Sequence, residues 1–291
     1  MEIKLYFCDF DNVGDALNRC IYKKCFDIDV SYADSWRSDY AGIGSILDHF
    51  LFQTRDIFRV FKNISYIKKP VILMSCGFGR ESEFYFQKPR FFKTMKFKRK
   101  IQVLSLRGKL SADQIAMIDK KIDLSNIVLG DMGLLASYLL ENREEKKYDL
   151  GICPHYADAG DPVFQKIHND NPGSIILNTM ENPIDFVKKI SQCRAVISTG
   201  LHPLIIADSL GIPNLWCRIS EKTTTRHKYY DYYSVFSVKP QPVNLFEEEI
   251  STEKVISNYQ IDPFKVEAVK FDLYQHHKKF FDMLKNGAGK I

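Results

Sequence analysis

His202 has the sequence setting best suited to chemistry, because it follows a predicted strand and begins a predicted helix. Residues 194–198 form a β-branched run typical of a buried strand, and Pro203 suits the first position of a helix that ends near Gly211. In an open α/β sheet, ligands bind at such junctions, and the free N–H groups of the helix favour an anion. An imidazole there predicts a site that binds phosphate or carboxylate and transfers a proton. The alternative is a histidine that only caps a loop.

Four other loops that follow predicted strands carry polar residues suited to the same site. They are residues 11–15 with Asn12 and Asp15, residues 76–79 with Gly77, the loop at Arg107, and residues 154–158 with His155 and Tyr156. Each has a structural alternative as well: Asp15 suits the first turn of a helix by charge alone, and an arginine often pairs with a neighbouring acid. Because Arg107 lies in a predicted loop, we expect the fold to tolerate its replacement. Arg226 and Lys228 follow later, in a tyrosine-rich stretch predicted to be a loop that closes over an anion.

Composition and missing motifs exclude several classes of protein. The chain has no zinc-binding HExxH pattern, no P-loop, no GxSxG pattern and no metal-ligand spacing, so we expect no metal. Seven cysteines without a CxxC pair indicate reduced thiols and a cytoplasmic protein. The first residues do not resemble a signal peptide, and no apolar stretch is long enough to cross a membrane.

Strands and helices alternate along the whole chain, which predicts an α/β fold with two doubly wound domains. The predicted strands are 3–8, 71–75, 101–106, 126–129, 149–153, 174–177, 194–198 and 214–217, and a long helix is predicted over 263–285. Residues 141–148 are charged and poor in large apolar side chains. We therefore place the boundary there and predict domains of residues 1–145 and 146–291.

The positive charge of the chain is concentrated in one segment. Residues 88–100 hold seven Lys or Arg and no acid, against a net charge of +5 for the whole protein, and phenylalanines lie among them. Such a segment suits an anionic membrane surface, a nucleic acid, or a solvated loop. Nothing else in the chain favours a nucleic acid, so we expect no such partner and predict peripheral contact of residues 86–100 with the inner face of the membrane.

The order of the motifs resembles the polysaccharide pyruvyl transferase family, particularly its bacterial exopolysaccharide and capsule members. The resemblance is carried by residues 12–18, 42–47, 77–79, 106–108 with Ser111, 130–131, 154–156, 200–203 and 231–233. It implies two facing Rossmann-like domains, as in GT-B glycosyltransferases, with the site in the cleft. It also implies transfer of pyruvate from phosphoenolpyruvate to a sugar or lipid-linked oligosaccharide, forming a ketal and releasing phosphate without a cofactor.

The resemblance implies a role for each candidate residue. The second domain would form the donor side, with His202 contacting the phosphate or acting as acid. Arg107 from the first domain would also bind the donor, together with Thr199, Gly200, Leu201, Arg226 and Lys228. The first domain would bind the acceptor. Asp15 and His155 are candidates for acceptor binding or for the base, and Asn12, Gly77 and Tyr156 complete the acceptor side.

Two departures from the family pattern keep other interpretations open. Many relatives have arginine where this chain has Gly200, and proline where it has Met132. With glycine at residue 200, the anion site lacks the positive charge that the arginine would supply. A GT-B glycosyltransferase that uses a nucleotide sugar, or an inactive relative that binds an anionic glycolipid, are therefore the alternatives.

Overall fold

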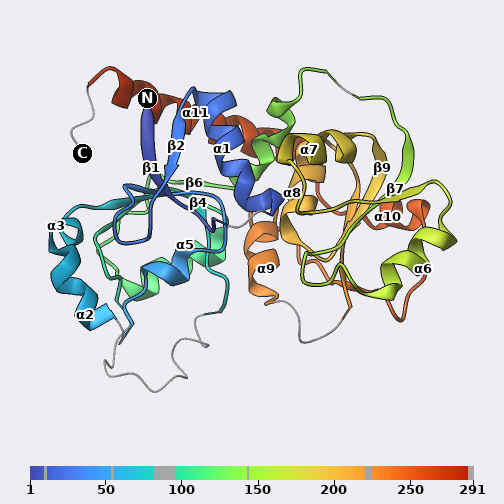
Figure 1. Cartoon of the computed structure of the whole chain (residues 1–291), viewed down its shortest axis with the longest axis horizontal. Helices are drawn as coiled ribbons and strands as arrows, with labels where there is room; N and C mark the ends of the chain where they lie inside the picture. The colour runs from blue at the N-terminus through green and yellow to red at the C-terminus, as the bar shows by residue number, and fades with distance from the viewer. Residues whose placement is uncertain (10–11, 54–55, 82–95, 143, 220–224, 288–291) are drawn as a thin grey trace.

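Two parallel β-sheets organise the protein (Figure 1). The computed structural model describes residues 1–9, 12–53, 56–81, 96–142, 144–219 and 225–287. The first sheet has the order β2-β1-β3-β4-β5-β6. Its strands are β1 (Glu2–Tyr6), β2 (Asp29–Tyr32), β3 (Tyr40–Ala41), β4 (Val71–Cys76), β5 (Ile101–Leu106) and β6 (Val128–Leu129). The second sheet has the order β11-β10-β9-β7-β8. Its strands are β7 (Tyr148–Cys153), β8 (Ser174–Ile176), β9 (Cys193–Ser198), β10 (Asn214–Arg218) and β11 (Val243–Asn244).

Both faces of each sheet are covered, as a doubly wound fold requires. Along β4, Ile72 and Met74 belong to one buried cluster, whereas Val71 and Leu73 belong to another on the opposite face. The covering helices are α1 (Val13–Phe26), α5 (Lys109–Ile118), α6 (Pro162–Asp170), α7 (Pro183–Ser191), α8 (Leu201–Ser209), α9 (His227–Ser234), α10 (Thr252–Asn258) and α11 (Pro263–Lys285). Short helical segments are η1 (Leu47–Phe50), α2 (Ile57–Val60), η3 (Phe61–Asn63), α3 (Ile64–Ile67) and η4 (Met132–Leu139).

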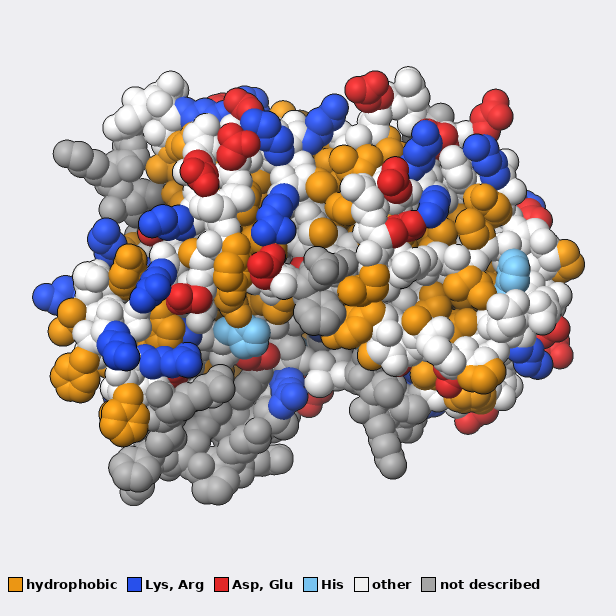
Figure 2. Space-filling model, viewed as in Figure 1, with side chains coloured by type: hydrophobic (Ala, Val, Ile, Leu, Met, Phe, Trp, Pro, Cys, Tyr) orange, Lys and Arg blue, Asp and Glu red, His pale blue; other side chains and the backbone are white. Residues whose placement is uncertain are grey.

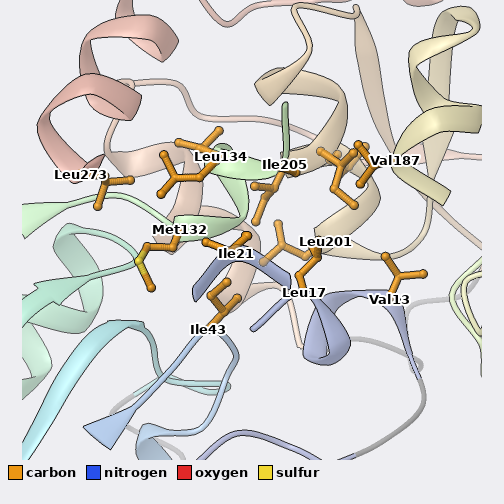
Figure 3. Packing of buried hydrophobic residues seen from close by; sticks show 14 of the residues in the cluster. Val13, Leu17, Ile21, Ile43, Met132, Leu134, Val187, Leu201, Ile205 and Leu273 are labelled. Carbon is orange, nitrogen blue, oxygen red and sulfur yellow. The ribbon is translucent and has the colours of Figure 1, made fainter. Parts of the chain in front are cut away.

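One hydrophobic core joins the two halves of the protein (Figure 3). Leu17 and Ile21 of α1 pack with Leu201 and Ile205 of α8, and η4 lies beside both helices. The long helix α11 follows the second sheet in the sequence but packs back against α1, η4 and β6. The two halves are therefore joined by packing as well as by the chain. The division at residue 145 stays a prediction.

Strands β2, β3 and β11 were not predicted from the sequence, and three further segments differ from the sequence-based expectations. The stretch that contains Lys228 is the helix α9 and not a loop, because Tyr229, Tyr232 and Tyr233 recur at helical spacing and are buried. The segment after Asp131, for which the sequence predicts a helix that ends near residue 142, is the 3₁₀ helix η4. In α8 the cap is Gly200, so Pro203 occupies the third helical position and not the first.

No helix among the described residues combines the length and the apolar character that a membrane span needs.

Candidate active site

A cavity of about 220 Å³ lies where strands of both sheets end. Its walls come from the loops after β1, β3, β7, β8 and β9 and from the start of α9. They are formed by Cys8, Asn12, Val13, Gly14, Asp15, Gly44, Ser45, His155, Tyr156, Thr179, Gly200, Leu201, His202, Pro203 and Lys228. Because parallel strands end at the same edge of each sheet, segments far apart in the sequence meet here.

The structure brings most of the predicted site residues together. The cavity is lined by eight of them: Asn12, Asp15, His155, Tyr156, Gly200, Leu201, His202 and Lys228. Thr199 lies directly behind the wall, where its Oγ1 accepts a hydrogen bond of 2.9 Å from the N–H of His155. Gly77, Arg107 and Arg226 do not line the cavity.

Several lining residues were not singled out from the sequence. Gly14, Gly44 and Ser45 belong to motifs that carried the family resemblance, so a signal for them existed. The sequence contains no such signal for Cys8 and Thr179, because neither residue type indicates a site by itself.

The amino ends of two helices point into the cavity, which favours an anion there. At α1, Asn12 is the cap, and its side chain accepts a hydrogen bond from the N–H of Asp15. At α8, the cap is Gly200, which has no capping side chain, so Leu201 and His202 present N–H groups without an intrahelical partner. Among the described residues that line the cavity, Lys228 in the first turn of α9 supplies the cationic side chain.

Both histidines of the cavity are neutral at pH 7. Burial, followed by the positive charges of Lys228 and Arg107, lowers the pKa of His202 to about 3. Burial and Lys228 likewise lower the pKa of His155 to about 4. Nδ1 of His155 accepts a hydrogen bond of 3.3 Å from the N–H of Ala157, which assigns the proton of its neutral ring to Nε2. His155, which lines the cavity, therefore carries a hydrogen-bond donor at Nε2.

Asp15 and Lys228 are the cavity groups that titrate near neutral pH. Burial raises the pKa of Asp15 to about 7, although the side chain of Asn12 donates a hydrogen bond to it and Lys228 lies near. Burial, followed by Arg107, lowers the pKa of Lys228 to about 8. A carboxyl group with a pKa near the working pH is well suited to general acid–base catalysis.

Gly14 leaves space for the imidazole of His202. A Cβ atom at residue 14 would lie 1.9 Å from Nδ1 of His202, far inside van der Waals contact. The first turn of α1 therefore touches the ring directly.

Gly14→Ala is expected to displace the His202 ring and to weaken the binding of inorganic phosphate by about tenfold or more, since charge-assisted contacts contribute about 1.5–3 kcal/mol each. Titration calorimetry measures the affinity. In a His202→Ala background, the same substitution should change it less than about twofold. Gly160→Ala is the control, because no atom lies within 4 Å of a Cβ placed there. Equal losses in both backgrounds would contradict the contact.

Arg107 lies behind the cavity in a buried network that ties α9 to the first half. Its Nε donates to Oδ2 of Asp231 (3.0 Å), Nη1 donates to Oγ of Ser45 (2.8 Å), and Nη2 donates to the carbonyl oxygen of Phe78 (2.6 Å). The side chains of Arg107 and Asp231 are 1% and 0% exposed. Gly77 is required beside them, since a Cβ there would lie 2.4 Å from Nη2. Arg107 lies in a loop, as predicted, but its buried ion pair leads us to expect that its replacement destabilises the fold.

The basic segment is described only from residue 96 onward, and residues 86–95 lie outside the described part. Lys98 and Arg99 are buried. Nζ of Lys98 donates to Oγ of Ser35 (2.6 Å), and Nη1 of Arg99 donates to the carbonyl oxygen of Ser38 (2.6 Å). The expectation that these two cations face a membrane is wrong, because both side chains hold the loop after β2 in place.

A model of the family described as "Polysaccharide pyruvyl transferase" matches residues 6–221. The chain belongs to the polysaccharide pyruvyl transferase family. The match includes all of the cavity residues except Lys228, which α9 supplies from just beyond it. In this member of the family, Gly200 has ordinary space around it: a Cβ there would lie 3.7 Å from Cδ2 of His155. A Cβ at residue 200 would also lie 3.5 Å from Cδ of Pro203 and from Oγ of Ser198, which is ordinary van der Waals contact.

Among curated proteins, the chain is similar to "Uncharacterized protein L143" of Acanthamoeba polyphaga mimivirus, with 29% identity over 240 residues, or 80% of this chain and 74% of that protein. Among solved structures, a putative UDP-N-acetylglucosamine 2-epimerase from Listeria monocytogenes gives a TM-score of 0.52 at 11% identity, covering 97% of both chains. The S. aureus MnaA–UDP structure gives 0.52 at 10% identity and covers 95% of this chain and 97% of that one. The protein therefore has a GT-B-like α/β fold of two facing Rossmann-like units with a long C-terminal helix.

Proposed function

We propose that this family member transfers the pyruvyl unit of phosphoenolpyruvate to two hydroxyl groups of a sugar in a polysaccharide precursor, forming a ketal and releasing phosphate. The observation that carries the proposal is the convergence of two helix amino ends, Lys228 and a carboxyl group with a pKa near 7 on one small cavity. Family membership supports the general reaction.

The donor carries a phosphate and a carboxylate, and the cavity offers contacts suited to both. The N–H groups of Leu201 and His202 and the ammonium group of Lys228 would hold these anions. Fixed donors of this kind also stabilise the phosphate as it departs. The volume of about 220 Å³ is below the roughly 300–1,000 Å³ typical of pockets for drug-sized ligands, which favours a three-carbon donor.

Asp15 is the group we assign to proton transfer. In its acid form it would give a proton to the methylene carbon of the donor, and the first sugar hydroxyl would attack the neighbouring carbon. The carboxylate left on Asp15 would then accept the proton of that hydroxyl. When the C–O bond to phosphate breaks, the second hydroxyl attacks the same carbon. Its proton passes to the departing phosphate, which leaves as hydrogen phosphate, and the ketal is closed. Nε2–H of His155 would orient a hydroxyl or a phosphate oxygen.

Phosphoenolpyruvate is expected to stabilise the protein against thermal unfolding, and nucleotide sugars are not. At a ligand concentration a hundredfold above its dissociation constant, the gain should be about 2.7 kcal/mol. Lys228→Met should abolish the shift, because the variant keeps the length of the side chain and loses its charge. Mass spectrometry with a panel of hexosides and lipid-linked oligosaccharides then detects the ketal.

Each other outcome would point to an alternative. A shift with a nucleotide sugar alone would indicate a glycosyltransferase. A shift with phosphoenolpyruvate but no release of phosphate with any acceptor would indicate an inactive relative.

A further inference from the structure

Three large apolar side chains protrude from one short stretch of the first half. Phe58, Phe61 and Ile64 are 82%, 79% and 59% exposed, and they lie on the consecutive segments α2, η3 and α3. These segments lie at the outer end of the first half, away from the second sheet (Figure 1). Two nearly fully exposed phenylalanine rings three residues apart form an unusual apolar patch for a water-facing surface.

The charged side chains of the same stretch are all basic. Arg59, Lys62, Lys68 and Lys69 are exposed, and residues 57–80 contain no Asp or Glu. Figure 2 shows hydrophobic side chains protruding among Lys and Arg side chains at this edge of the molecule. Exposed rings elsewhere have a different setting: Phe264 is 86% exposed, but it lies between Asp262 and Glu267.

This combination favours a lipid surface over a protein partner. Protein interfaces are depleted in lysine, whereas apolar rings beside Lys and Arg are typical of segments that lie in the interface of an anionic bilayer. The rings enter the boundary between headgroups and acyl chains, and the cations stay at the level of the lipid phosphates. The surface shares no residue with the basic segment of residues 88–100. From that segment, the buried Arg99 donates through Nη2 to the carbonyl oxygen of Lys69 (3.4 Å).

We propose that residues 57–69 form a docking surface for an anionic lipid bilayer. The surface lies outside the cavity, so the proposal does not depend on the reaction assigned to it. Because its apolar side chains are exposed, replacing them removes no packing from the core.

The test is sedimentation of the full chain with vesicles of phosphatidylglycerol and phosphatidylcholine, compared with vesicles of phosphatidylcholine alone. The wild-type protein should bind the anionic vesicles, and binding should weaken steeply with salt. The Phe58→Ser/Phe61→Ser variant should bind at least about tenfold more weakly, since each ring loses its contact with the acyl chains. Arg59→Gln/Lys62→Gln should likewise lose about tenfold or more.

Phe264→Ser is the matched control and should bind as the wild-type protein does. Light scattering after size exclusion measures the oligomeric state of the same variants. The proposal is overturned if the wild-type protein does not sediment with anionic vesicles, or if the Phe58→Ser/Phe61→Ser variant binds them unchanged. It is also overturned if the surface serves a second copy of the chain instead, so that the wild-type protein is a dimer without vesicle binding and that variant is a monomer.

Discussion

Arg107→Met is expected to lower the free energy of unfolding by about 3–5 kcal/mol, because it leaves the carboxylate of Asp231 buried without its cationic partner. Two further acceptors, the Ser45 hydroxyl and the Phe78 carbonyl, lose their donor as well. Urea unfolding followed by circular dichroism measures the loss. Since Asp231 anchors α9, the affinity of the cavity for phosphate should fall together with the stability.

Arg194→Met is the control for the loss of an arginine–aspartate pair. Arg194 contacts Asp149 at 2.9 Å, but both side chains are about half exposed, so its replacement should cost less than about 1 kcal/mol. Adding Asp231→Asn to Arg107→Met should recover part of the stability, because it removes the unpaired charge. No recovery in the double variant would show that the buried charge is not the cause of the loss.

Asp15→Asn is expected to lower turnover by about 10²–10⁴-fold if Asp15 transfers the proton. For the wild-type protein, kcat/KM should fall as the pH rises through about 7, because Asp15 loses the proton that it must give. The residual activity of Asp15→Asn should lack this limb. Assays of phosphate release between pH 5 and 9 compare the two profiles.

Asp15→Asn should also raise the stability of the protein at high pH. Burial raises the pKa of Asp15 from 3.8 to about 7, so its contribution to stability is complete below pH 4 and is lost as the pH rises through 7. Asp15→Asn should therefore be more stable than the wild-type protein at pH 8, by on the order of 2–4 kcal/mol, and nearly equal to it at pH 4. Asp185→Asn, at the equivalent helical position after the cap Asn182 but exposed, should show neither effect. Equal responses of the two variants would contradict the role of burial.

The α/β fold, the long helix over residues 263–285 and most of the cavity followed from local patterns in the sequence. Strands and capped helices can be recognised from local sequence patterns. In any α/β sheet, the carboxyl ends of the parallel strands lie at the same edge. The loop containing His202 was informative for this reason. Its neighbours Asp15 and His155 could be grouped with it because they follow strands of the same kind.

The features that could not be predicted from the sequence depend on contacts between distant residues, which no local pattern encodes. Arg107 has the same neighbours in the sequence whether it meets a ligand or Asp231, which lies more than a hundred residues further along. Burial of Lys98 and Arg99 depends on the loop after β2. The tyrosines of α9 look polar in the sequence, although their rings pack into the core. The low pKa values of the histidines likewise arise from burial and from distant cations, which only the folded chain provides.

The return of α11 to the first half has a consequence for synthesis on the ribosome. His277 contacts Oγ of Ser105 at 3.0 Å, and Nζ of Lys285 donates to the carbonyl oxygen of Phe26 (2.8 Å). The first sheet is therefore translated long before the helix that covers it. At about 5–20 residues per second, the helix follows on the order of 10–30 s after the sheet. The apolar surface that it covers is exposed during that interval, which favours aggregation of the nascent chain.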